Sequence, residues 1–123
     1  MSHGGYLRQH SDDPVMASHV LYDYTKSDLD SHGLGVLDYA VELALTPASV
    51  EQADVEKLRS LGLTDEQILS TALITAYFSV MSRLANGLDV ELPPGRQEAQ
   101  ERWMSKGAAN QEWLMGKKVS TTT

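Results

Sequence analysis

The sequence predicts an all-α protein, and three observations support that fold class. Apolar residues recur at spacings of three and four, several positions carry signals for helix starts and ends, and no segment shows the alternating pattern of a half-buried strand. With 123 residues, 41% hydrophobic and 22% charged, the chain has the composition of an ordinary folded domain. We therefore expect one helical domain with a sizeable core.

The first two expected helices are placed by prolines. Pro14 follows Ser11-Asp12-Asp13, a capping sequence with proline in the first turn, so we expect a short amphipathic helix from there to about Thr25. A second helix is expected over 31–46, where an apolar stripe runs along one face. Pro47 should end it, because the residue before a proline is pushed away from helical geometry.

Two further helices follow. The segment 54–61 should be short and closed by Gly62, a residue suited to the position just past a helix end. Thr64 and Gln67 then form a capping box that opens a helix expected to run to Asn86, with Gly87 as its terminator. Apolar residues cover most of the circumference of this last helix. It should therefore be a central helix, or be covered by a partner subunit.

The C-terminal part has a different character. We expect a domain over residues 1–92, a break at Pro93-Pro94-Gly95, and a tail over 93–123 whose residues 96–114 can be helical. Both tryptophans, Trp103 and Trp113, lie in this tail, and large aromatic side chains there favour docking on the body or on a neighbouring subunit. The final residues, 117–123, should be disordered.

Charge and hydropathy narrow the possible partners. The net charge is −7, with −9 over residues 1–95 and +2 over 96–123, so no overall basic field for nucleic acid exists. The longest apolar stretch, 68–84, is interrupted by polar residues, and we expect no membrane span. No charged segment followed by an apolar one marks a signal peptide at the start, so the default expectation is a cytoplasmic location.

Residue counts exclude several chemistries. The sequence has no cysteine, which removes thiolate metal sites, disulfides and cysteine nucleophiles from these 123 residues. All four histidines lie in the first 32 residues, and His3 and His10 would share a helix side if a helix ran through them. The usual zinc spacing of two histidines and a carboxylate is missing, so no metal is expected. No cofactor motif is present, and spacing alone defines no active site.

One distributed set of residues points to a family. The chain resembles the carboxymuconolactone decarboxylase superfamily, and within it the AhpD-like, peroxidase-related branch of alkylhydroperoxidases. The resemblance spans about residues 3–92 and rests on His3-Gly4, Leu7-Arg8, Asp13-Pro14, Asp23-Tyr24, Asp28-Leu29, Leu37-Asp38-Tyr39-Ala40, Asp54-Val55, Leu58-Arg59, Gly62, Asp65-Glu66, Ile68-Leu69, Ala76-Tyr77-Phe78 and the run 83–88. Ser79 and Ser82 depart from it, because the branch often has asparagine at these two places.

The resemblance implies an AhpD-like helical bundle that lacks the family's N-terminal helices. In the family a Cys-x-x-Cys motif reduces peroxides, and a histidine four residues after the second cysteine assists; His3 corresponds to that histidine, which places the cysteines before Met1. The resemblance also implies homo-oligomers built from dimers or trimers. Three interpretations stay open: an inactive fragment or diverged member of a thiol peroxidase, a non-catalytic homo-oligomeric binding or scaffold protein, and a cysteine-independent enzyme that uses His3 or His10.

Overall fold

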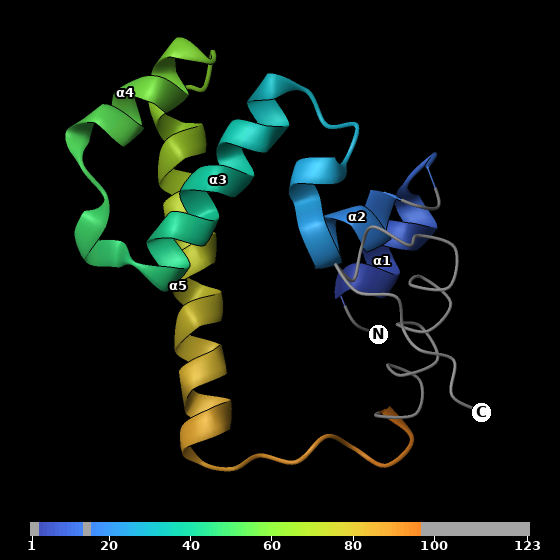
Figure 1. Cartoon of the computed structure of the whole chain (residues 1–123). Helices are drawn as coiled ribbons and strands as arrows, with labels where there is room; N and C mark the ends of the chain where they lie inside the picture. Colours follow the sequence, from blue (N-terminus) through green and yellow to red (C-terminus); the bar gives the residue numbers. More distant parts are fainter. Residues whose placement is uncertain (1–2, 14–15, 97–123) are drawn as a thin grey trace, which may run out of the picture. The chain divides into compact units, whose positions relative to one another are not determined.

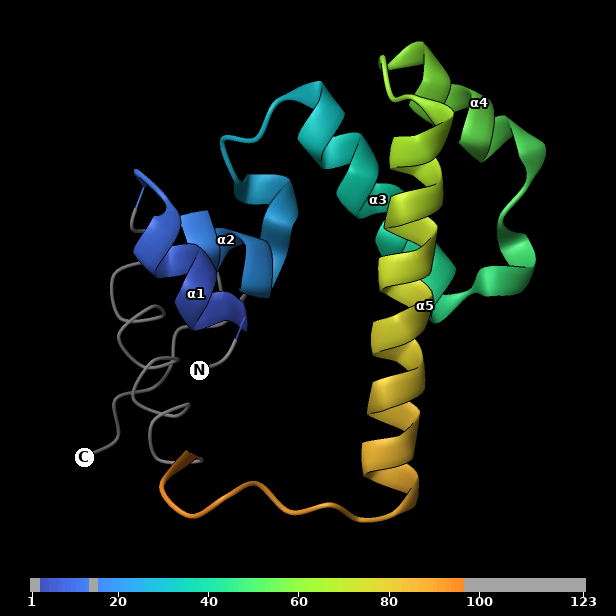
Figure 2. The same ribbon diagram turned by 180° about the vertical axis from the view of Figure 1, so that it is seen from behind.

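The computed structural model describes residues 3–13 and 16–96, and within these ranges all regular structure is helical (Figures 1 and 2). The described residues divide into two compact units. One comprises Leu29–Glu91, and the other contains the residues up to Asp28 together with those from Leu92 onward. The all-α prediction is confirmed. The helix predicted over 96–114 and the two tail tryptophans lie outside the described residues.

The N-terminal unit holds two short helices, α1 (His3–His10) and α2 (Met16–Asp23), followed by the 3-10 turn Tyr24–Lys26. The sequence signals marked only the second helix, and Pro14 at its expected start lies outside the described residues. The two helices pack on each other, and the Arg8 guanidinium donates a hydrogen bond of 3.1 Å to the buried Ser18 hydroxyl. The helix ends at Asp23, two residues before the predicted end, and the Asp23 carboxylate accepts from the Thr25 N–H.

In the second unit, α3 (Ser31–Leu45) agrees with the predicted 31–46 helix. The Asp30 carboxylate caps it by accepting from the Gly33 N–H at 2.8 Å, and Pro47 begins a 3-10 turn, Pro47–Ser49, immediately after it. The next helix, α4 (Gln52–Ser60), begins two residues before the predicted start at Asp54. The reason is that the Asp54 carboxylate accepts the Glu51 N–H at 2.7 Å, so Asp54 lies inside the first turn.

The long helix α5 (Asp65–Gly87) has the predicted capping box, in which Thr64 and Gln67 bind each other's backbone N–H groups. Its C-terminus differs from the prediction. Gly87 is the last helical residue, and Asp89 takes the left-handed conformation at φ 51°. The Val90 N–H bonds to the Ala85 carbonyl and the Asp89 N–H to the Asn86 carbonyl, which is a Schellman ending two residues later than expected.

The core of this unit lies where α4 and the first turns of α5 meet α3. It consists of Tyr39, Leu58, Leu63 and Ile68, with the partly buried residues Val36, Leu43, Val50, Val55, Leu61 and Ala72 around it. Gly35 allows α3 to approach this cluster, because a Cβ there would collide with the Leu61 side chain. Beyond this junction α5 crosses α3, and its C-terminal turns extend past both α3 and α4 (Figures 1 and 2).

Candidate functional site: a polar groove and an apolar face on one helix

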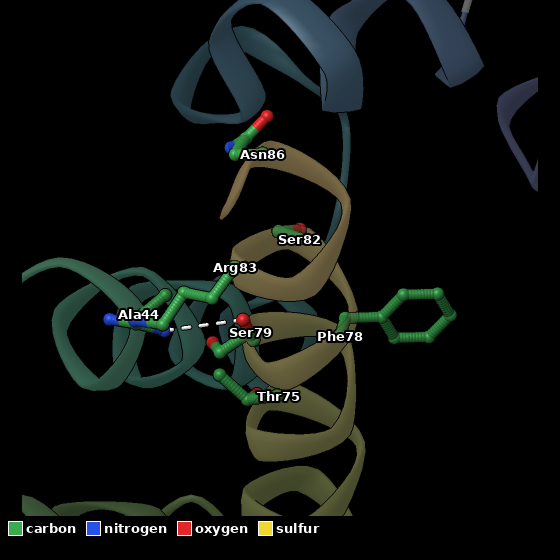
Figure 3. Close-up of a pocket in the computed structure, with 7 residues that line it drawn as sticks. All are labelled: Ala44, Thr75, Phe78, Ser79, Ser82, Arg83 and Asn86. Carbon is green, nitrogen blue, oxygen red and sulfur yellow. Dashed lines mark hydrogen bonds between the residues drawn. The ribbon is translucent and has the colours of Figure 1, made fainter. Parts of the chain in front are cut away.

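A groove of about 480 Å³ lies between α5 and the end of α3. Ala44 lines it from α3, and the other lining residues are Thr75, Phe78, Ser79, Ser82, Arg83 and Asn86 on α5 (Figure 3). Polar residues at 75, 79, 82, 83 and 86 share one side of a helix with 3.6 residues per turn. In Figure 3 the Phe78 ring points away from the Arg83 and Ala44 side. The groove is therefore lined on the α5 side mainly by a stripe of polar residues, which we call the polar stripe, on a largely apolar helix.

Arg83 supplies the charge of this groove. Its guanidinium donates to the Ser79 carbonyl at 3.3 Å and lies toward Ala44 (Figure 3). Within the described part of the chain Arg83 forms no ion pair, whereas Arg59 pairs with both Glu56 and Asp65. A guanidinium surrounded by hydroxyl and amide groups can hold a carboxylate or another anion. The groove contains binding groups, but no nucleophile with an adjacent base.

Apolar side chains form the opposite side of α5. Leu69, Leu73, Tyr77, Val80 and Leu84 are exposed by 59%, 60%, 61%, 55% and 52%, and we call these five residues the apolar face. By length and composition α5 would also suffice to cross a membrane, a test that core helices of soluble proteins pass as well. The sequence predicts a central helix or one covered by a partner. In the structure, Ile68 is the only buried residue of α5. The described residues leave this face uncovered.

The histidines lie in separate local environments. His3 is the exposed first residue of α1, and His10 is the last, where its ring stacks on Tyr6 at 4.0 Å and its Nδ1 lies 2.9 Å from the Tyr6 carbonyl. His19 lies on α2 and His32 on α3. No group of three metal-ligating side chains occurs among the described residues. A helix does run through His3 and His10, and the role of His3 stays a prediction.

Sequence reasoning missed the groove at Arg83. The signal was present, since the polar residues of the last helix recur at three- and four-residue spacings. From Thr71 onward they lie on one side of the helix, which indicates a second surface on the helix rather than mere breaks in hydropathy. Ser79 and Ser82, first noted as departures from the family pattern, both line this groove.

Comparisons with known proteins give matches among solved structures. No profile of a known protein family matches the chain, and no curated protein matches it. An uncharacterized peroxidase-related protein from Silicibacter sp. TM1040 is similar with a TM-score of 0.69 and 32% identity over 76% of this chain and 49% of that one. The alkylhydroperoxidase AhpD core of a peroxidase-related protein from Ralstonia eutropha JMP134 is similar with a TM-score of 0.67 and 30% identity, over 85% and 52%.

These likenesses, with the all-helical topology, define the fold class as that of AhpD-like helical proteins. More narrowly, the chain has an AhpD-like, peroxidase-related fold, as its residues indicated. It spans about half the length of the two solved structures that it matches.

Proposed function

We propose that this protein takes part in thiol-dependent peroxide reduction as the helical framework of an AhpD-like protein, with the reactive thiol supplied from outside these 123 residues. The fold likeness carries the proposal, because both similar structures are peroxidase-related proteins. The sequence contains no cysteine, and peroxide reduction by this route requires a thiolate. On its own the 123-residue chain is therefore expected to be inactive as a thiol peroxidase.

His3 is the residue of this chain proposed to act in that reaction. It is exposed at the first position of α1, where a neighbouring group can reach the imidazole. The imidazole of a histidine can take a proton from a thiol and pass it on. His10 makes a matched comparison on the same helix, because its ring is stacked on Tyr6.

The test compares the 123-residue chain with the product of the whole reading frame in which it lies. Reduction of tert-butyl hydroperoxide by dithiothreitol is measured for both. We expect no turnover above the blank for the 123-residue chain, turnover for a product that carries Cys-x-x-Cys, and at least a tenfold loss on His3→Ala against little change on His10→Ala. A reading frame without cysteines would contradict the proposal, and unchanged turnover on His3→Ala would remove His3 from it.

The apolar face favours a second function, a non-catalytic homo-oligomeric binding or scaffold protein. A row of large apolar side chains, each more than half exposed, is typical of surfaces that associate with a partner. In this case the 123-residue chain should form a stable, helical assembly with no peroxidase activity. Sedimentation and circular dichroism check this: a clean monomer without a cooperative unfolding transition would contradict it.

A further inference from the structure

We propose that the groove between α5 and the end of α3 binds a small organic carboxylate. Arg83 holds the carboxylate group, and the methyl groups of Ala44 and Thr75 contact the carbon chain. This inference goes beyond both proposed functions, because it requires neither a thiol nor a second copy of the chain. It assigns a class of ligand to the polar stripe.

The lining of the groove carries a single charge, which is positive. Arg83 is the only ionisable residue among the seven described residues that line the groove, so no carboxylate lies among them. Within the described part of the chain its guanidinium forms no ion pair, whereas Arg59 is paired with Glu56 and Asp65. A cation that no acid of its own unit pairs with favours an anionic ligand.

Arg83 also keeps most of its hydrogen-bond donors for a ligand. A guanidinium has five N–H groups, and one of those on Arg83 donates to the Ser79 carbonyl at 3.3 Å. This distance exceeds the usual value of about 2.9–3.0 Å, so the bond is weak and can be exchanged for a better one. The planar guanidinium can bind both oxygens of a carboxylate at once, which favours a carboxylate among anions.

Hydroxyl and amide groups flank the guanidinium along the helix. Ser82 lies one residue before Arg83 and Asn86 three residues after it, and all three line the groove (Figure 3). A carboxylate has about four acceptor positions, of which a guanidinium uses two. The O–H of Ser82 and the N–H groups of Asn86 are suitable donors for the remaining positions.

The floor of the groove suits a short carbon chain. Ala44 and Thr75 are partly buried there, whereas Arg83 is exposed. The Thr75 hydroxyl donates to the Thr71 carbonyl at 2.8 Å, which leaves its methyl group to contact a ligand. The groove volume of about 480 Å³ lies in the range of pockets that bind organic molecules. A bare inorganic anion would leave most of this space to water.

The first experiment measures the binding of butyrate to the 123-residue chain. In a nitrogen–proton correlation NMR titration at constant ionic strength, butyrate should shift the backbone amide signals of residues 75–86 in a saturable way. One exposed ion pair gives modest affinity, so the dissociation constant should be about 1 mM. Butyramide has the same chain without the charge and should bind at least tenfold more weakly. Formate has the charge without the chain and should bind at least threefold more weakly.

The second experiment changes the groove. Arg83→Gln should weaken butyrate binding at least tenfold without changing the circular dichroism, because Arg83 is exposed. Arg59→Gln is the matched control, since it removes the same charge from an exposed arginine outside the groove and should leave the dissociation constant unchanged. Arg83→Lys keeps the charge but loses the planar donor pair, so its affinity should be intermediate. Thr75→Ser removes only the methyl group and should weaken the binding of butyrate but not of formate.

Four results would overturn the proposal. They are the absence of saturable shifts up to about 50 mM butyrate, which is about fifty times the expected dissociation constant, equal binding of butyramide, unchanged binding by Arg83→Gln, and inorganic phosphate binding as tightly as butyrate. The last result would assign the groove to inorganic anions. None of these readouts involves peroxide or association between copies, so a failure here is distinguishable from a failure of either proposed function.

Discussion

The two sides of α5 carry apolar residues of similar size, but the residue on one side is buried and those on the other side are exposed. Ile68 is 7% exposed and packs with Leu58 and Leu63 at the junction of the three helices. One residue further along, Leu69 is 59% exposed, and the rest of the apolar face is similar. Hydrophobicity alone therefore does not locate the core of this unit. The core forms where α3 and α4 converge on the first turns of α5, and the other apolar side is exposed among the described residues.

The largest expected effect comes from the buried side of this comparison. Leu58 is 1% exposed, so Leu58→Ala removes buried methyl groups and leaves a cavity, and we expect a loss of about 2–5 kcal/mol in the free energy of unfolding. Urea denaturation followed by circular dichroism measures it. Leu73→Ala is the matched variant on the exposed side and should cost far less in dilute solution, with any effect growing as protein concentration rises. Equal losses at low concentration would break the comparison.

The next effect concerns the close approach of α3 to the core. A Cβ at Gly35 would collide with the end of the flexible Leu61 side chain, at an overpacking cost of about 1–3 kcal/mol, while alanine inside α3 returns about 0.5–1 kcal/mol of helix propensity. Gly35→Ala should therefore destabilise the fold by up to about 2 kcal/mol. Gly87→Ala tests the same change at the open end of α5, where a Cβ meets nothing within 4 Å. That variant should stabilise the protein by about 0.5–1 kcal/mol. Thermal melts of both variants should shift in opposite directions, and shifts of the same sign would contradict the packing described for Gly35.

A smaller effect is expected at the start of α5. Thr64→Ala removes the oxygen that accepts the Gln67 N–H at 3.2 Å and should cost about 1 kcal/mol in unfolding free energy. Thr64→Ser keeps this oxygen and serves as the control, with a cost of no more than a few tenths of a kcal/mol. Urea denaturation compares the two.

The smallest effect is expected at Arg59. Its hydrogen bond to Asp65 and the charges of Asp65 and Glu56 raise the pKa of the Arg59 guanidinium above its usual value, so it is charged at neutral pH. The groups are exposed, and water and salt screen them. Arg59→Gln should therefore have the least effect of these variants, and 0.5 M NaCl should abolish it in thermal melts. A salt-independent loss would indicate a packing role instead.

Local signals predicted much of the second unit. The Thr64 capping box, Pro47 and Gly62 each act within a few residues, so the helices they delimit could be read from the sequence. The start of α4 was placed late because Asp54 reads equally well as a cap or as a first-turn acid. No sequence signal marked α1, because no acidic residue lies in its first turn. None of its residues is buried in the structure either.

The candidate site was less predictable, for a physical reason. Which side of α5 is buried depends on where α3 and α4 pack, and that is a tertiary property. Ile68 and Leu69 are neighbours in sequence and equally apolar, yet they end on opposite sides of the core boundary. The groove at Arg83 follows from the same packing, because Ala44 of α3 lines it on the side facing α5. The place of His3 in any reaction stays a prediction.

The turn between α4 and α5 also bears on the order in which the chain folds. Gly62 at φ 95° lets the Leu63 N–H reach the Leu58 carbonyl and the Gly62 N–H reach that of Arg59, so α4 ends in a Schellman motif. Two of the core side chains, Leu58 and Leu63, are thereby brought together across five residues of chain, where loop closure costs little entropy. We expect this corner to be structured in the folding transition state, with α3 docking onto it afterwards.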